Sequence, residues 1–281
     1  MRRSVLLLVV LAVVSSGRVW GQAREIPSAA PAQATGSPEE QGRKLLDEMV
    51  EALGGQAWKD RKDMQVLGRT AAFFRGQPNG TVIEYTGWRR FPDATQGGAE
   101  RIGFLSDKSM ILPGKKIDIV QIWTADNGYE VTYKGRTTMP KEIVEDYQRR
   151  KKHSIESVVN DWLKAPGVMI LSEGSTMVDR RIAEKVTVLS ADNDAVTIEL
   201  DAATHLPLRR AFRFRNPQFN DFDEDAETYS DYHTVQGLPT AYNVARYKNG
   251  EMVNQRFLMK VEYNMGLSAE LFNPDNLLKK K

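Results

Sequence analysis

Alternation of apolar and polar side chains runs through the second half of the chain and limits its fold more than any other feature. In residues 194–214, Val196, Ile198 and Leu200 alternate with polar residues, and the pattern resumes after a turn at residues 204–207. Successive side chains of a strand point to opposite faces, so this pattern predicts an antiparallel hairpin with one apolar and one wet face. The rest of the chain must supply its neighbours.

Further strands are predicted on both sides of this hairpin. Their ranges are 64–74, 81–91, 100–105, 117–124, 129–134, 168–171 and 185–189 before it, and 227–232, 240–248 and 253–263 after it. Short connections rich in Gly, Pro, Asn and Asp indicate antiparallel pairing. The last strand predicts an apolar face of Val253, Phe257, Met259, Val261 and Tyr263. Arg256 falls on the opposite, wet face.

Two helical regions are predicted. Ser37 is a cap for a helix over residues 38–53, which has Pro38 at its first position and ends at Gly54. Residues 140–164 form the second region, with a break near residues 153–154. Its second half carries a broad apolar face of Ile155, Val158, Val159, Trp162 and Leu163. A single sheet of about ten strands must curl, split or close, so we expect a strongly curved sheet with helices on its concave side.

The first 37 residues read as export and linker segments. Residues 1–21 combine Arg2 and Arg3 with a short apolar run, as a signal peptide does, and cleavage at Ala23 also fits. Residues 22–37 predict a disordered leader, residues 38–276 a single domain, and residues 277–281 a basic tail. The chain has no cysteine, which excludes disulfides and a lipid-anchoring cysteine. We expect a soluble periplasmic monomer, with secretion as the alternative location.

Charge and motif content exclude several function classes. Removing residues 1–21 takes three arginines and no acid, which leaves 36 basic against 37 acidic residues. Such a balance gives no basic footprint for nucleic acid. The sequence lacks the phosphate-binding loops, metalloprotease motif and nucleophile elbow of common enzymes, and its three histidines lie far apart. We therefore expect no enzyme activity, no cofactor and no metal site.

Two charged stretches each leave two interpretations open. Asp221, Asp223, Asp225 and Glu227 resemble the start of a calcium loop, but Ala226 replaces the required glycine, so a solvated hairpin loop is the stronger interpretation. Residues 149–152 are four consecutive cations. They could receive anionic head groups, although a helix end that complements its dipole is the simpler interpretation.

Several turn sequences together resemble a known group of proteins. They are residues 200–209 (LDAATHLPLR), 229–232 (YSDY), 236–239 (QGLP), 261–264 (VEYN) and 271–274 (LFNP), with Trp58 after the early Leu-Gly-Gly. This set is similar to the outer-membrane lipoprotein-sorting and periplasmic lipoprotein-carrier (LolA/LolB-like) superfamily, best over the second half. The resemblance implies a mainly β (α+β) fold: an incomplete antiparallel β-barrel capped by helices, with an apolar cavity for acyl chains.

Two functions follow from this resemblance and stay open. The first is a carrier that shelters acyl chains of a lipid or lipoprotein, with inner- or outer-membrane envelope proteins as further partners. The second is an envelope sensor or scaffold with a packed interior. For the carrier, the candidate cavity residues are Trp88, Phe91, Phe104, Trp123, Tyr133, Ile155, Val159, Trp162, Leu163, Phe212, Phe214 and Phe257. We expect residues 155–163 to be a lid over this cavity, with core packing as the alternative.

Overall fold

The structure, a computed structural model, describes residues 36–278 except residues 81, 94, 96, 107–115 and 217. The expected signal peptide, nearly all of the expected leader, most of the connection expected between the strands at residues 100–105 and 117–124, and the last three residues of the tail lie outside these ranges. The described residues belong to one compact unit. No helix in them is long and apolar enough to cross a bilayer.

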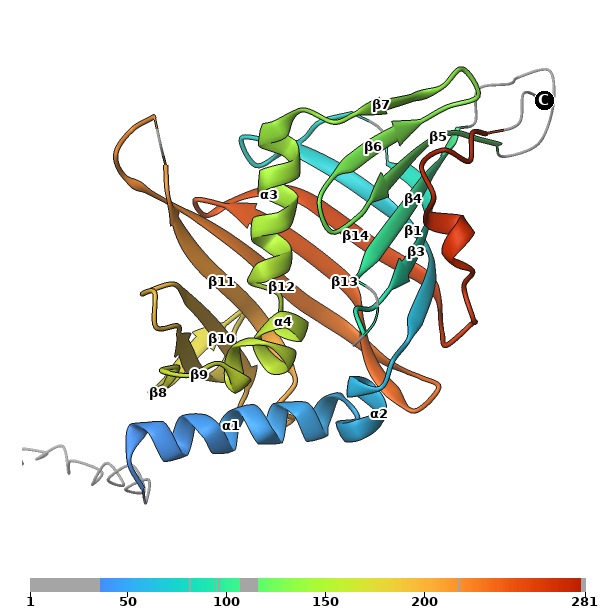
Figure 1. The fold of residues 1–281 in the computed structure, drawn as a ribbon. Coiled ribbons are helices and arrows are strands. Elements are labelled where there is room, and N and C mark those ends of the chain that lie inside the picture. Colours follow the sequence, from blue (N-terminus) through green and yellow to red (C-terminus); the bar gives the residue numbers. More distant parts are fainter. Residues whose placement is uncertain are drawn as a thin grey trace, which may run out of the picture. The chain divides into compact units, whose positions relative to one another are not determined.

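One antiparallel sheet dominates this unit (Figure 1). Its strands are β1 (Asp63–Phe74), β2 (Gln77–Pro78), β3 (Ile83–Arg90), β4 (Ala99–Ser106), β5 (Lys116–Trp123), β6 (Gly128–Val131), β7 (Arg136–Thr138), β8 (Met169–Val178), β9 (Arg181–Leu189), β10 (Ala195–Asp201), β11 (Pro207–Arg215), β12 (Phe222–Val235), β13 (Leu238–Lys248) and β14 (Glu251–Tyr263). The order is β7-β6-β5-β4-β3-β1-β14-β13-β12-β11-β10-β9-β8, and β2 pairs only with β1. The sheet is strongly curved but does not close, since β7 and β8 remain its two edges. This confirms the predicted incomplete barrel.

The helices connect and cover the ends of this sheet. They are α1 (Pro38–Leu53), α2 (Gly55–Lys59), α3 (Lys141–Lys152), α4 (Ile155–Asn160), η1 (Trp162–Lys164) and η2 (Ala269–Phe272). Because β7 and β8 are the two edges, the chain between them must pass from one edge to the other. It does so through α3, α4 and η1, and α3 lies across strands β11–β14 (Figure 1). The crossover therefore places helices over the concave side.

Capping residues set the helix boundaries as predicted. The Ser37 side chain accepts a hydrogen bond from the Glu40 backbone N–H, and the Glu40 side chain accepts one from the Ser37 N–H, which makes a capping box. The second helical region breaks after His153, where Ser154 caps α4. Gly54 ends α1 in the left-handed conformation, at a φ of 119°.

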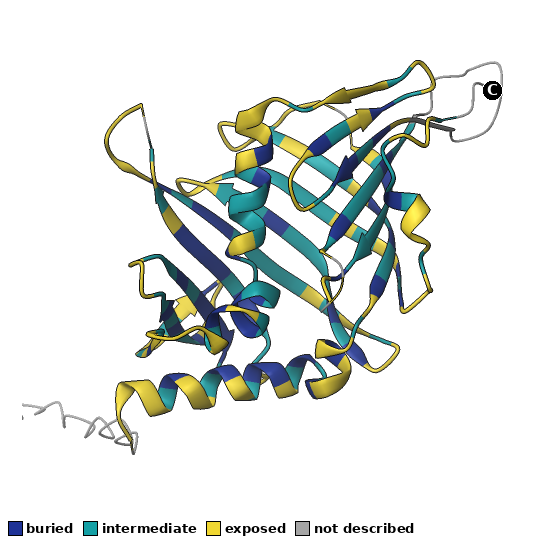
Figure 2. Cartoon of the chain, viewed as in Figure 1, coloured by how far each residue is buried: buried dark blue, intermediate teal, exposed yellow. Residues whose placement is uncertain are grey.

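A dry core fills one part of the unit, where α1, α4 and η1 pack on strands β8–β11 (Figure 2). Leu46 and Met49 of α1, Val158 of α4 and Ile198 of β10 are each at most 1% exposed. Gly42 lets α1 approach β8 closely, because a Cβ there would lie 2.8 Å from Ile170 Cγ2. Burial of this apolar face gives α1 most of its stability.

A β-bulge reverses the expected faces of β14. Leu67 of β1 lies opposite Lys260, but the next residue, Gly68, lies opposite Leu258, so Met259 is an extra residue. One extra residue exchanges the faces of everything beyond it. Phe257 and Met259 are therefore exposed, at 39% and 43%, and Arg256 faces inward. The predicted apolar face was wrong for this half of the strand and correct for Val261 and Tyr263, which are buried.

Candidate binding cavity

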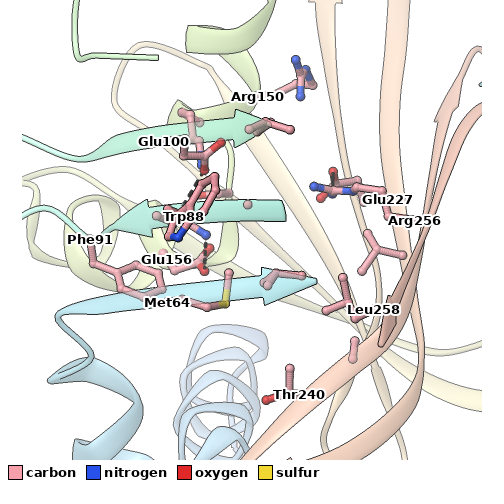
Figure 3. Close-up of a pocket in the computed structure, with 18 of the residues that line it drawn as sticks. Met64, Trp88, Phe91, Glu100, Arg150, Glu156, Glu227, Thr240, Arg256 and Leu258 are labelled. Atoms are coloured by element: carbon pink, nitrogen blue, oxygen red, sulfur yellow. Dashed lines mark hydrogen bonds and ion pairs between the residues drawn. The ribbon is translucent and has the colours of Figure 1, made fainter. Parts of the chain in front are cut away.

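A cavity of about 290 Å³ lies between the inner face of the sheet and the crossover helices. Strands β1, β3, β4 and β11–β14 line it, together with the second half of α3 and the start of α4. Its volume is close to the lower limit of roughly 300–1,000 Å³ that is typical of small-molecule sites. In Figure 3, Glu100 and Glu156 lie on one side of the space, and Glu227 and Arg256 lie on the other.

The first wall is a network of ion pairs between β3, β4 and the helices. Arg89 of β3 lies 3.2 Å from Glu156 and 3.4 Å from Glu100. Arg61, which precedes β1, lies 3.7 Å from Glu156, and Lys151 of α3 contacts Glu100. Two carboxylates therefore hold three cations, and α3 and α4 are tied to the sheet by charge as well as by apolar contact.

The cations of this wall keep both carboxylates ionised. Burial alone would raise the pKa of Glu100, but Lys151 and Arg89 outweigh it and hold the pKa at about 2. The pKa of Glu156 is also about 2, because Arg89 and Arg61 outweigh the effect of burial. Burial and the neighbouring Arg89 lower the pKa of Lys151. The surroundings thus favour the charged forms of both carboxylates and disfavour that of Lys151.

The second wall comes from strands β11, β12 and β14. Glu227 lies 3.1 Å from Arg210 and 3.2 Å from Arg256, and it accepts a 3.0 Å hydrogen bond from the Tyr229 hydroxyl. Burial raises the pKa of Tyr229, so that this hydroxyl stays protonated and donates. The pKa of Glu227 is well below its usual range, since Arg210 and Arg256 outweigh the effect of burial.

Arg210 is a buried cation with unused donors. Its side chain is 2% exposed, and Nη1 lies 3.7 Å from Asp225, too far for a hydrogen bond. Nε and Nη1 have no hydrogen-bond partner among the described residues. Buried donors of this kind are rare in proteins.

Apolar side chains cover the part of the cavity that adjoins the dry core. Met64, Val66, Ile102, Val244 and Leu258 line it. Val66 belongs to the dry core, and Met64, Ile102 and Leu258 pack against that core. Met64 and Leu258 lie below the charged groups in Figure 3. The cavity thus has a charged upper part and an apolar floor.

The first wall separates this cavity from a second one. A space of about 520 Å³ is lined by Arg90, Thr124, Gln148 and Asn160, and it shares Arg89, Glu100, Lys151 and Glu156 with the first cavity. The shared side chains form a partition held by ion pairs. Such a partition can open only if charged groups exchange partners.

The cationic run at residues 149–152 occupies the last turn of α3, where its charges complement the helix dipole. Arg149 stacks on Phe214 and Lys152 pairs with Asp194. Arg150 and Lys151 line the cavity. One run therefore ends the helix and contributes two cations to the charged upper part.

The structure brings only some of the predicted cavity residues together. Trp88 and Phe91 line the cavity. Ile155, Val159, Trp162 and Phe212 lie in the dry core, with Phe104, Leu163 and Phe214 packed against it. Trp123 stacks on Tyr147 of α3, with ring centroids 4.2 Å apart, and Tyr133 and Phe257 are exposed. The apolar face of residues 155–163 is therefore part of the core, and Ser154 and Glu156 are the crossover residues beside it that reach the cavity.

Sequence reasoning missed the charged strand residues of both walls because it assigned charges in strands to the wet face. A signal was present for Arg210, which has the same parity as the apolar Leu208 and Phe212 of β11. Glu227 shares its parity with Tyr229. The solvated loop expected at residues 221–227 is wrong, since these residues belong largely to β12 and Asp225 is 1% exposed. No group of three or more metal-ligating side chains occurs in the described ranges.

Comparisons with known proteins give the fold at low sequence identity. No family model matches the sequence, and no curated protein matches it. A crystal structure of a DUF1329 family protein from Desulfovibrio piger is similar at a TM-score of 0.58 and 12% identity, over 86% of this chain and 100% of that one. An outer membrane lipoprotein-sorting protein domain from Vibrio parahaemolyticus gives a TM-score of 0.52 at 11% identity, over 84% of this chain and 97% of that one. The chain therefore has a lipoprotein-carrier-like (LolA/LolB-like) fold.

Proposed function

We propose that the protein is a periplasmic, non-enzymatic carrier that shelters an acyl chain of a lipid or lipoprotein between the curved sheet and the crossover helices. The observation that carries this proposal is the cavity with an apolar floor on the concave side. Met64, Val66 and Leu258 form part of that floor, where a solid core would need side chains in contact. The fold shared with a lipoprotein-sorting domain supports the same proposal.

Extraction and titration test this function together. Organic extraction of the purified protein followed by mass spectrometry should find acyl-chain molecules, and the delipidated protein should bind a fluorescent acyl probe saturably. Gly87 supplies a matched pair of variants, because it lines the cavity and a Cβ there would meet only ordinary contacts of 3.5 Å or more. Gly87→Leu should fill part of the space and abolish probe binding, and Gly87→Ala should keep it. Absence of both bound lipid and saturable uptake would contradict the carrier.

A scaffold or sensor is the second candidate, and the packing of the crossover favours it. The apolar face of α4 and η1 is buried, with Val158 at 0% and Trp162 at 6% exposure, so these residues do not cover an open space. If the cavity holds only water, its ion pairs serve the fold and the outer surface carries the function. Failure of the uptake experiment would leave this candidate.

A further inference from the structure

The charges that line the cavity do not balance. Among the described lining residues, seven are cationic and three are carboxylates, namely Glu100, Glu156 and Glu227. Two carboxylates lie behind this lining: Asp146 pairs with Arg150, and Asp225 lies near Arg210. Counting both still leaves the cations in the majority. Unbalanced charge in a partly buried space is unfavourable, and a bound anion would compensate it.

We propose that the cavity binds an amphiphile with an anionic head group, a phosphate or a carboxylate, which lies between the two charged walls with its chain on the apolar floor. This inference rests on the proposed function and adds the class of cargo. The head group would meet Arg150, Arg210 and Arg256. The chain would run toward Met64 and Leu258, which lie below Arg256 and Glu100 in Figure 3.

The second wall is the better receptor for the head group. Arg210 lines the cavity with a side chain that is 2% exposed, and its Nε and Nη1 have no hydrogen-bond partner among the described residues. Nη1 lies 3.7 Å from Asp225 Oδ1, which also has none, so Nε is the donor without a facing carboxylate. A guanidinium presents its donors in a fixed fork that matches a phosphate or carboxylate. Arg256 has one carboxylate partner, Glu227, which it shares with Arg210. An anion could therefore add to this site without removing Glu227.

The opposite wall adds to the same attraction. Arg89, Arg61 and Lys151 outnumber Glu100 and Glu156. Arg101 is also among the lining residues, but it is next to Glu100 in β4, so its side chain points to the opposite face of the sheet, where its guanidinium lies over the Trp88 ring and donates to the backbone oxygen of Leu271. Both walls therefore present excess positive charge to the space between them. A neutral or cationic head group would find no comparable set of partners there.

Chain-matched ligands test the inference. Dodecyl phosphate, dodecanoate, dodecanol and dodecyltrimethylammonium, each below its aggregation concentration, would compete with a fluorescent acyl probe on the purified protein. We expect both anions to bind roughly tenfold more tightly than dodecanol, which a charge-assisted contact supplies, and dodecyltrimethylammonium to bind most weakly. Equal affinities for dodecanol and the anions would overturn the anionic cargo and leave the carrier intact. Binding by none of the four would overturn both.

Two further arms identify the source of the anion and its receptor. Inorganic phosphate alone should displace neither the probe nor dodecyl phosphate; displacement by phosphate would assign the site to a free anion and overturn the amphiphile. Arg256→Gln and Arg150→Gln should each weaken dodecyl phosphate binding by roughly fivefold or more and change dodecanol binding less than about twofold. The matched control is Arg69→Gln, because Arg69 is also half-exposed and pairs with one carboxylate, Glu84, but does not line the cavity. Equal effects of Arg256→Gln and Arg69→Gln would overturn the assignment.

Discussion

The dry core and the charged cavity share the same curved sheet but use its inner face in opposite ways. Around β8–β11 the inner face carries Val186, Val196 and Ile198, all at 0% exposure, against the apolar sides of α1 and α4. Around β3, β4, β12 and β14 the inner face carries arginines and glutamates under α3. The first region is filled by side chains that need no ligand. The second contains more cations than carboxylates, which is the basis for the proposed anionic ligand.

This difference in composition explains why one region is densely packed and the other contains a cavity. Aliphatic side chains interdigitate at high density and leave few voids. Paired guanidinium and carboxylate groups are held at fixed distances by their directional contacts, and their excess cations keep apart, so that the space between two such walls stays open. The difference suggests that stability is concentrated in one region and binding in the other.

The largest effect is expected from opening a hole in the dry core. Trp162 is 6% exposed, and its indole N–H donates a 3.0 Å hydrogen bond to the backbone oxygen of Lys152. Trp162→Ala should lower the free energy of unfolding by about 3 to 5 kcal/mol, as for other large-to-small core changes. Denaturant unfolding measures this loss, and affinity for the acyl probe should stay the same.

The matched control is Met177→Ala on β8, because Met177 is 67% exposed and its loss should change the free energy of unfolding by less than about 0.5 kcal/mol. A small loss for Trp162→Ala together with a changed affinity would contradict the assignment of residues 155–163 to the core. That result would support the alternative in which residues 155–163 form a lid over the cavity.

A smaller effect is expected from one carboxylate of the first wall. Glu156→Gln would leave Arg61 and Arg89 without this partner and should cost about 2 to 3 kcal/mol at neutral pH, less than a fully buried pair because the Glu156 side chain is 23% exposed. The surface pair of Glu39 and Arg43 gives the control, and Glu39→Gln should cost less than about 0.5 kcal/mol. Equal losses would mean that the partition contributes nothing to the fold.

The same wall predicts an acid-sensitive contribution to stability. Glu100 and Glu156 have folded pKa values of about 2, below their unfolded value of 4.5. A lowered folded pKa gives stability that is complete above the unfolded pKa and is lost as the pH falls toward the folded pKa. Between about pH 5 and about pH 2 the wild type should therefore lose more free energy of unfolding than Glu156→Gln does. Parallel curves for the two proteins would contradict this role of Glu156.

The two regions also differ in how far the sequence predicts them. The dry core follows from local rules: the capping box at Ser37 and the alternation in β10 identify the elements and the faces that pack. Residues that bury apolar surface reveal their orientation by their spacing. The helix over residues 38–53 is accordingly predicted to the residue, and the break expected near residues 153–154 is confirmed.

The charged cavity escapes such rules because its residues break them. Arg256 faces inward only because Met259 is an extra residue in β14, and a bulge depends on the partner strand, which a single sequence does not show. Asp63, which does not line the cavity, also depends on distant partners: its carboxylate accepts hydrogen bonds from the backbone of Met265, Gly266 and Leu267, some 200 positions away. Arg210 could have been recognised from its place among apolar residues.

A still smaller loss is expected where α1 approaches the sheet edge. In an exposed helix interior, alanine is more favourable than glycine by up to about 1 kcal/mol. At Gly42, however, a Cβ would lie 2.8 Å from Ile170 Cγ2 and 3.1 Å from the Ser172 backbone nitrogen. Gly42→Ala should therefore destabilise by about 1 to 2 kcal/mol in denaturant unfolding, with no change in affinity. Lys44→Ala on the exposed side of α1 is the control. A higher free energy of unfolding for Gly42→Ala would show that Ile170 and the backbone of β8 can move to accept the added Cβ.

The smallest change in stability is expected for Arg256, where the change in binding should be large. Its side chain is 44% exposed and has Glu227 as its carboxylate partner, and exposed ion pairs contribute about 0.2 to 1 kcal/mol. Arg256→Gln should therefore lower the free energy of unfolding by less than about 1 kcal/mol, close to the effect of Arg69→Gln. Unfolding curves for both variants, measured beside their affinities for dodecyl phosphate, make the decisive comparison. A loss of stability for Arg256→Gln as large as that of Trp162→Ala would mean that the charged walls hold the fold together as the dry core does, and the division between the two regions would fail.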